Sequence, residues 1–238
     1  MWRELAHGAV GVVAAIFLLG QVRKPGRWAG RPFLWMMNLT HSPLTTWGLE
    51  HVTIGKDFVI LDVGCGGGAT VSRLAAMAPE GRVCGIDYAN GSVAVSRRKN
   101  AALTAAGRVD IRKASVSQLP FDPGTFDLVT AIETHYYWPD LAGSMREIRR
   151  VLKPGGTLII IAESYRGSRF GALQRVVMKP LKSAHLSADE HRELFVAAGY
   201  SDVRVIEHRG RGWICAVGHV SDLMNTPDAP ESVRPSSR

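Results

Sequence analysis

A short glycine-rich segment, Gly64-Cys-Gly-Gly-Gly68, directly follows an apolar run that ends at Val63. Glycines adopt positive φ angles and let a backbone approach a ligand closely. A helix that begins after such a loop offers free N–H groups and the positive end of its dipole. This combination is typical of sites for nucleotide-like ligands. The spacing is G-x-G-x-G, with Ala69 where the dinucleotide pattern G-x-G-x-x-G has its last glycine, so the loop alone leaves nicotinamide enzymes open.

Two carboxylates accompany this loop. Asp62 lies two residues before Gly64, where a buried carboxylate would repel a pyrophosphate but suit the amino group of a cationic ligand. Asp87 ends a second short apolar run, where it could accept hydrogen bonds from two ribose hydroxyls. The alternative for Asp87 is a cap of the helix or turn that follows. The two acidic positions favour a cationic nucleoside ligand.

A third group of polar and aromatic residues, Glu133-Thr-His-Tyr-Tyr-Trp-Pro-Asp140, follows the apolar run Phe126 to Ile132. In open α/β sheets, ligands bind at the carboxyl ends of the strands. We therefore expect three catalytic candidates, Glu133, His135 and Tyr136, and a substrate-pocket residue, Trp138. His135 could serve as a general base, or it could be a hydrogen-bonded structural histidine. The aromatic side chains could instead fill the core.

Further candidates lie on either side of this region. His41 and Trp47 are predicted to cover the substrate pocket, with packing against the edge of the sheet as the alternative. Glu163, Tyr165 and Arg166 follow another predicted strand. No histidines have i, i+4 spacing and no cysteines have C-x-x-C spacing, so we predict no metal site.

Apolar runs alternate with helical patterns between residues 57 and 163, and this alternation predicts a parallel sheet with right-handed crossovers. The expected strands are 58–63, 82–86, 109–114, 126–132 and 157–162, and the expected helices are 70–78, 92–106 and 141–152. Ser187-Ala-Asp-Glu190 is a capping box that predicts a further helix, followed by closing strands at 203–206 and 213–220. We predict a doubly wound, mostly parallel, seven-stranded Rossmann-like sheet with an N-terminal helical extension.

The predicted domain therefore spans residues 57–220, with a helical insertion at 164–186. Residues 1–22 are expected to form an apolar helix, and residues 23–56 a cap or lid segment. Residues 221–238 are rich in Pro, Ser, Asp and Arg and are expected to be disordered.

Charge and hydropathy bear on location. The chain has a formal net charge of +8, and part of the excess lies in residues 1–31. Their apolar run, 5–20, is shorter than the roughly 20 residues that span a bilayer, and no signal-peptide cleavage site follows it. It could be a membrane-surface anchor or a helix packed over the domain. We expect a cytoplasmic protein, with association at the inner face of the membrane through residues 1–31, and no nucleic-acid partner.

Four blocks in the middle of the chain resemble the class I S-adenosylmethionine (SAM)-dependent methyltransferases. They are Val59-Ile-Leu-Asp-Val-Gly-Cys-Gly-Gly-Gly68, Gly85-Ile-Asp87, Leu119-Pro-Phe with Thr125-Phe-Asp-Leu-Val129, and Arg150-Val-Leu-Lys-Pro-Gly-Gly-Thr157. The resemblance covers about residues 57–163 and is strongest to the small-molecule branch that includes ubiquinone and menaquinone C-methyltransferases. It implies SAM as cofactor and a small-molecule methyl acceptor, without specifying which one. The apolar amino terminus favours a lipophilic acceptor.

The resemblance also implies roles for single residues. The SAM site would comprise Asp62, Gly64 and Gly66 at the methionine end, Asp87 at the ribose, Tyr88, Ser115 and Val116 around the adenine, and Glu133 near the methyl donor. Many relatives carry an acidic residue at the position of Ser115. Three alternatives stay open: a methyltransferase for protein or nucleic acid, a nicotinamide dehydrogenase, and a non-catalytic SAM-binding module. The segment from Glu133 to Tyr136 lacks the Asn/Asp-Pro-Pro-aromatic block of many amino-group methylases.

Overall fold

The computed structural model describes residues 42–163, 165–166 and 184–222. Several predictions fall outside these ranges: the helix at 1–22, the pocket residue His41, most of the insertion at 164–186 and most of the C-terminal tail. Within the described ranges, no helix is both long and apolar enough to cross a bilayer.

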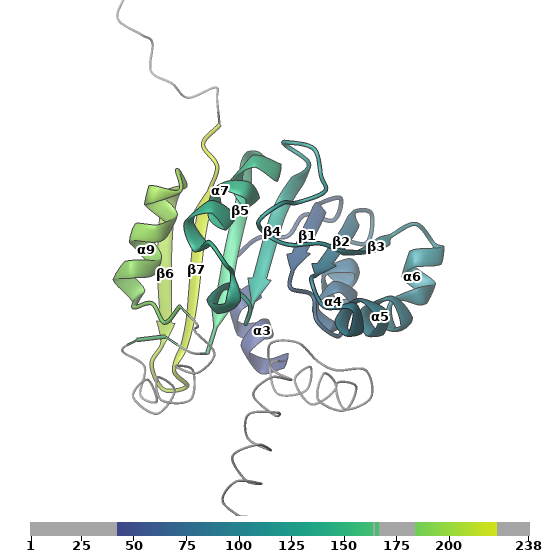
Figure 1. Ribbon diagram of the computed structural model, residues 1–238, viewed down its shortest axis with the longest axis horizontal. Helices are drawn as coiled ribbons and strands as arrows, with labels where there is room; N and C mark the ends of the chain where they lie inside the picture. The colour runs from purple at the N-terminus through teal and green to yellow at the C-terminus, as the bar shows by residue number, and fades with distance from the viewer. Residues whose placement is uncertain (1–41, 164, 167–183, 223–238) are drawn as a thin grey trace, which may run out of the picture.

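A single seven-stranded sheet forms the centre of the molecule (Figure 1). Its order is β3-β2-β1-β4-β5-β7-β6, and β7 alone runs antiparallel to its two neighbours. This architecture confirms the predicted doubly wound, mostly parallel sheet. The strands are β1 (Val59–Val63), β2 (Arg82–Asp87), β3 (Val109–Lys113), β4 (Phe126–Ile132), β5 (Leu152–Ala162), β6 (Ser201–His208) and β7 (Trp213–His219).

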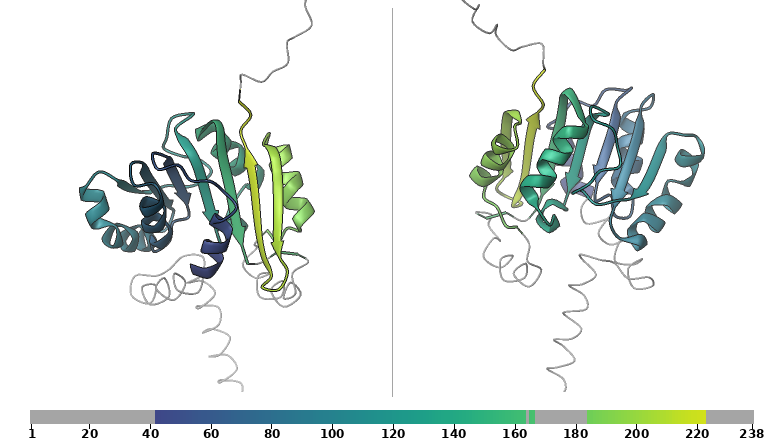
Figure 2. Two further views of the ribbon diagram at one scale, coloured as in Figure 1. Left: turned by 180° about the vertical axis from the view of Figure 1, so that it is seen from behind. Right: turned by 45° about the horizontal axis from the view of Figure 1, so that its top comes forward.

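Helices cover both faces of the sheet, as the two views in Figure 2 show. The helices of one face are α3 (Ser42–Leu49), α4 (Ala69–Met77), α5 (Asn90–Lys99) and the short α6 (Ala101–Ala105). The other face carries α7 (Leu141–Val151) and α9 (Ala188–Ala197), and a 3₁₀ turn, η1 (His135–Tyr137), follows β4. Each face has its own hydrophobic cluster, because successive residues of a strand point to opposite sides.

The central strands are apolar on both faces, as expected for a sheet covered by helices on both sides. Ile60 belongs to the cluster beneath α4, while Leu61 and Val63 belong to the cluster beneath α7. Helix α7 buries Met145 and Ile148, whose i, i+3 spacing places them on one helix face. The predicted capping box at the start of α9 is present, with Ser187 and Glu190 each accepting from the other's backbone N–H.

The predicted single helix over residues 92–106 is wrong. The helix breaks at Asn100, which separates α5 from α6. The Asn100 side chain donates to the carbonyls of Gly68 and Ser96 and accepts from the Ser72 hydroxyl at 2.7 Å. This buried residue therefore supports the end of the glycine loop, a long-range role that local helix propensity does not report.

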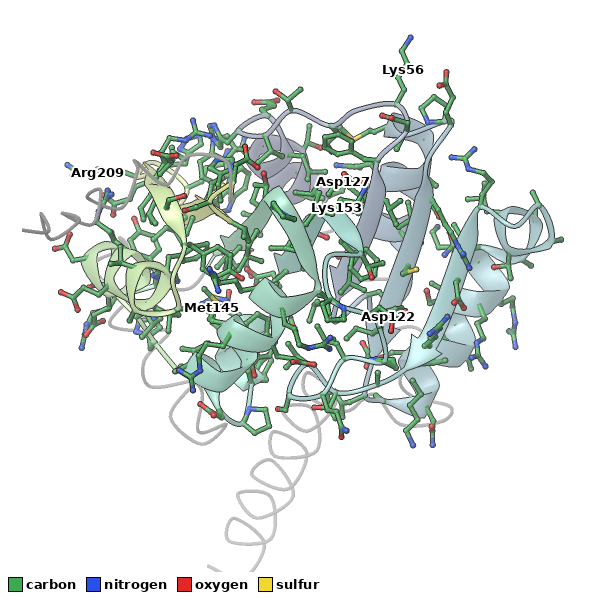
Figure 3. The ribbon with its side chains drawn as sticks, turned by 90° about the horizontal axis from the view of Figure 1, so that it is seen from above. Lys56, Asp122, Asp127, Met145, Lys153 and Arg209 are labelled. Carbon is green, nitrogen blue, oxygen red and sulfur yellow. The ribbon has the colours of Figure 1, made fainter. Side chains whose placement is uncertain are left out.

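The start of β5 also differs from the prediction. The strand begins at Leu152, and its pairing with β4 shifts register after Phe126 to accommodate the Lys153–Gly156 turn. The ammonium of Lys153 lies 2.7 Å from the Asp127 carboxylate, which also accepts from the Val59 backbone N–H at 2.8 Å (Figure 3). Asp127 therefore joins β1, β4 and β5 at their amino ends. Asp127 and Lys153 belong to two of the blocks that resemble methyltransferases, so these blocks have a structural role.

Candidate active site

A cavity of about 370 Å³ lies at the carboxyl ends of β1, β2 and β4. Most of the predicted cofactor and pocket residues line it: Asp62, Gly64, Gly66, Asp87, Tyr88, Ser115, Val116, Glu133 and Trp138. Strand polarity explains the convergence, because the parallel strands present their carboxyl ends at one edge of the sheet. The volume lies within the range of small-molecule sites.

The glycine loop between β1 and α4 is held by its backbone. The N–H groups of Gly64 and Cys65 both donate to the carbonyl of Ile86, at 2.8 and 2.9 Å. Gly64 has a φ of 75°, and a Cβ atom there would collide with the side chain of Thr134. Glycine is therefore required at this position by both conformation and space.

Asp87 is fixed at the end of β2 by two backbone donors. Its Oδ2 accepts from Gly66 N at 3.0 Å and its Oδ1 from Ala89 N at 2.8 Å. Burial raises the pKa of this carboxyl, and the bonds from Ala89 and Gly66 act in the opposite direction. The residue is only 8% exposed, whereas a carboxylate that binds a ribose would be expected to be more open to solvent. Asp87 therefore both faces the cavity and holds the glycine loop.

Asp62 is a buried carboxylate in the same cavity. Thr130 Oγ1 donates to its Oδ1 at 2.7 Å. Burial raises the pKa of Asp62 to about 7; the Thr130 hydrogen bond lowers it and the nearby Asp87 charge raises it further. Two acidic groups in one cavity favour a positively charged ligand, since such a ligand stabilises both ionised forms.

Glu133 lines the cavity directly after the end of β4. It has a φ of 56°, which is unusual for a residue other than glycine. Its Oε1 accepts from the Tyr136 hydroxyl at 2.7 Å and from the backbone N–H of Glu163. The carboxylate is thus positioned by groups from two segments that follow β4 and β5. Backbone strain at such a position is common at functional sites.

The structure does not bring His135 and Tyr136 to the cavity wall. His135 is fully buried and its Nε2 lies 3.2 Å from Nε2 of His191 on α9. Nδ1 of His191 must donate to the Ser187 carbonyl, 2.7 Å away, so its Nε2 accepts the proton of His135. His135 Nδ1 is then a buried acceptor with no hydrogen-bond partner among the residues that the structure describes. Burial, then His191, hold the pKa of His135 well below its ordinary range.

Trp47 is also placed outside the cavity wall. Its ring packs against His51, His208 and Trp213, with centroid distances of 5.0, 5.8 and 5.8 Å. This contact joins α3 to the hairpin of β6 and β7. It corresponds to the alternative in which the segment before β1 packs against the edge of the sheet.

Several cavity residues escaped the sequence analysis. Ser42 and Thr45 of α3 and Arg73 of α4 line the cavity. Arg73 donates to the Thr46 hydroxyl at 2.6 Å and to the Ser42 hydroxyl at 2.8 Å, which fastens α3 over α4. Tyr137, beside Trp138, adds a second aromatic side chain. A charged residue on an amphipathic helix gives no signal that distinguishes a cavity wall from a solvated surface.

Metal binding finds no support in the part of the chain that the structure describes, where no three metal-ligating side chains come together. Cys65, Cys84 and Cys215 are buried free thiols.

The cavity fits S-adenosylmethionine. Its lining includes a glycine loop in which Thr134 leaves no room for a Cβ at Gly64, and its two acidic residues, Asp62 and Asp87, match a ligand with cationic groups and ribose hydroxyls. Tyr88, which is 45% exposed, offers an aromatic ring to an adenine. A sheet of order β3-β2-β1-β4-β5-β7-β6 with this site at its carboxyl edge defines a class I methyltransferase fold.

Comparison with known proteins agrees with this class. Residues 61–160 match the family described as "Methyltransferase domain". The chain is 38% identical over 112 residues to demethylmenaquinone methyltransferase of Symbiobacterium thermophilum, covering 47% of this chain and 45% of that protein. It is 32% identical over 111 residues to sterol 4-C-methyltransferase strm-1 of Caenorhabditis elegans, covering 47% and 33%. The chain thus spans less than half the length of these two relatives.

The fold is shared more widely. A SAM-dependent methyltransferase from Aquifex aeolicus superposes with a TM-score of 0.64 at 20% identity, covering 79% of this chain and 97% of that one. Residues 61–160 are therefore a class I SAM-dependent methyltransferase domain, similar to the quinone C-methyltransferases, and its cofactor is S-adenosylmethionine.

Proposed function

We propose that this protein transfers the methyl group of S-adenosylmethionine to a small lipophilic acceptor, with S-adenosylhomocysteine as the second product. The observation that carries this proposal is a cavity with two chemically different ends. Asp62 and Asp87 line it from β1 and β2, while the apolar side chains of Ile132, Tyr137 and Trp138 line it from β4 and the segment that follows β4. A cationic cofactor and an apolar acceptor would thus meet in one enclosed space.

The cofactor end follows from the contacts already described. Asp62 and the loop at Gly64 and Gly66 are proposed to hold the methionine end, and Asp87 the ribose. Tyr88, Ser115 and Val116 are proposed to enclose the adenine, since all three line the same cavity. Bound SAM supplies an activated methyl group, so the protein needs chiefly to orient the acceptor and exclude water.

Glu133 is the residue proposed to act nearest the transferred group. It lies on the cavity wall directly after β4, next in the chain to the apolar lining residue Ile132. It could orient an acceptor hydroxyl or receive a proton from it. The hydrogen bond from Tyr136 and the one from Glu163 N hold it in place, which suits a group whose position matters more than its mobility.

His135 is proposed as a positioning residue and not as the general base. It is fully buried, and its Nε2 is committed to His191. Through this bond it fixes η1, which precedes the cavity residues Trp138 and Pro139, against α9. Its effect on turnover would pass through the shape of the cavity.

The acceptor class follows from the curated relatives, two of which are named for a demethylmenaquinone and a sterol. Incubation with methyl-labelled SAM and a reduced naphthoquinone that has an unsubstituted ring position tests it. We expect label in the quinone fraction, and none with the Asp87→Ala variant. Label found instead in added tRNA or protein would show a macromolecular substrate. SAM binding without transfer to any of these would favour a non-catalytic module.

A further inference from the structure

A cluster of aromatic and basic side chains lies outside the cavity, where α3 meets the turn between β6 and β7. We call it the hairpin-tip patch, and its members are Trp47, His51, His208, Arg209, Arg211 and Trp213. The four rings are half-buried against one another. The guanidinium of Arg211 lies over the Trp213 ring, 4.7 Å from its centroid. The patch combines amphipathic rings with exposed positive charge.

The basic side chains of this patch are strongly exposed. The Arg209 side chain is 87% exposed and extends from the margin of the molecule (Figure 3), and its guanidinium lies 3.6 Å from the Glu207 carboxylate. Arg211 is also exposed. Arg204, on β6 below the turn, donates to the His51 carbonyl at 3.0 Å and so fastens the end of α3 to the hairpin. A strongly exposed basic tip on a fixed aromatic base is an arrangement suited to an anionic surface.

The patch lies at the same edge of the sheet as the cavity. Ile214, next to Trp213, pairs with Ala162 at the carboxyl end of β5. The cavity lies at the carboxyl ends of the neighbouring parallel strands, and Thr45, two residues before Trp47, lines it. Figure 1 shows α3 and the turn between β6 and β7 together at this lower edge of the sheet. A surface that touched the patch would therefore lie beside the cavity.

We propose that the hairpin-tip patch docks on the anionic headgroups of a phospholipid bilayer. Tryptophan rings favour the membrane–water interface, and exposed arginines are attracted to an anionic leaflet. A nucleic acid fits less well, because bases need free ring faces. Trp213 is covered by Arg211, and Trp47 has three ring neighbours. The basic and apolar residues 1–31 precede this edge in the sequence, since the described chain starts on the cavity wall at Ser42.

Docking in this orientation would bring the cavity to the bilayer, where a lipophilic acceptor is dissolved. That purpose rests on the proposed function, but the docking itself is measured without cofactor or acceptor. Failure to bind lipid would therefore leave the methyl-transfer proposal standing, and absence of methyl transfer would leave the docking proposal standing.

The test uses a fluorescent label on the full chain, so that the contribution of residues 1–31 does not hide that of the patch. Gly210, at the turn, is exposed, and an added Cβ there meets only the His208 ring at 3.7 and 3.8 Å. A Gly210→Cys variant accepts an environment-sensitive dye selectively, because the three native cysteines are buried. A Lys99→Cys variant on α5, far from the hairpin in Figure 1, is the matched control.

Vesicles of phosphatidylcholine mixed with phosphatidylglycerol should shift the emission of the Gly210 label to the blue and leave the Lys99 label unchanged. Vesicles of phosphatidylcholine alone should have little effect. Reversing both charges, Arg209→Glu with Arg211→Glu, should weaken vesicle binding by about tenfold or more. Reversing Arg98 and Lys99 should weaken it much less.

The proposal is overturned if the chain does not bind anionic vesicles, or binds them while the Gly210 label stays unshifted. It is also overturned if the two pairs of charge reversals weaken binding equally. A single-stranded oligonucleotide that shifts the Gly210 label as strongly as the vesicles would replace the lipid with a nucleic acid as the partner.

Discussion

The two ends of the cavity are built in different ways. At the cofactor end, the contacts are made mostly by backbone groups near the glycine loop, such as the bonds from Gly64 and Cys65 to Ile86. At the acceptor end, the wall depends on side chains from distant parts of the chain, such as the bond between His135 and His191. A backbone site is specified by a short motif, whereas a side-chain site requires the whole fold. Substitutions at the cofactor end should therefore change mainly the affinity for the cofactor. Substitutions at the acceptor end should change mainly kcat and the free energy of unfolding.

The largest expected effect is at Asp87. Its replacement by alanine removes two hydrogen bonds from the ribose, each worth about 1.5–3 kcal/mol, so the affinity for S-adenosylhomocysteine should fall by roughly two orders of magnitude or more. Asp87→Asn should be milder, because the amide keeps one acceptor oxygen. Calorimetric titration measures both variants.

Asp87 also accepts from Gly66 and Ala89, so its loss should lower the melting temperature as well. Circular dichroism at the titration temperature shows whether each variant is folded. A folded Asp87→Ala protein with an affinity within about threefold of the parent would place the ribose elsewhere.

The hydrogen-bonded pair of His135 and His191 at the acceptor end should make the stability of the protein depend on pH. Both His135 and His191 have lowered pKa values, chiefly because of burial. The unfolded chain binds more protons than the native one below the ordinary histidine pKa of about 6.5, so stability should fall as pH decreases below it. The slope is about 1.4 kcal/mol per pH unit for each proton. Denaturant titrations between about pH 5 and 7 measure it.

A His135→Asn, His191→Asn double variant should lose most of this acid-side slope and also lower kcat more than the affinity for the cofactor. The matched control is His219→Asn, since His219 is half-buried and bonded to Thr157 in another part of the sheet. An unchanged slope in the double variant would show that protonation of these two histidines does not contribute to the pH dependence of stability.

Asp62 should give a smaller effect of opposite sign. Its raised pKa means that the native state holds the proton longer, so its stability contribution is present at low pH and is lost as pH rises from about 4 to about 7. A cationic cofactor binds the ionised form. Its affinity should therefore increase about tenfold between roughly pH 6 and 8. In Asp62→Asn this dependence should disappear, and an equally steep profile in that variant would contradict the assignment.

The smallest effect is expected where α3 covers the cavity. Thr46→Val removes the hydrogen bond that the Thr46 hydroxyl accepts from Arg73 and the one that it donates to the Ser42 carbonyl, and it should destabilise the protein by about 0.5–1.5 kcal/mol. We expect KM for the acceptor to rise while the affinity for SAM stays unchanged, because Ser42 and Thr45 of α3 line the cavity and are not among the residues proposed to hold SAM. Steady-state kinetics with both substrates varied separates the two. An equal loss in cofactor affinity would show that α3 belongs to the cofactor end.

Most of the residues predicted from the sequence to bind the cofactor line one cavity, because their signals are local. Gly64 and Asp87 lie in short patterns that follow apolar strands, and the strand order then brings them together. Arg73 and Ser42 gave no such signal, because their shared role depends on how α3 packs over α4. His135 was interpreted from its position after β4, but position does not show the direction of a side chain, and this one turns toward α9.

The place of β7 in the sheet has a consequence for synthesis of the chain. Among the strands that the structure describes, β7 is synthesised last, yet it lies between β5 and β6 and contacts α3 through Cys215 and the Gly48 carbonyl. Until it arrives, the completed parallel strands end at β5 with an open edge, which is a template for pairing with another chain. The local hairpin of β6 and β7 closes that edge in one step. A chain interrupted after residue 162 should therefore aggregate rather than persist as a smaller domain.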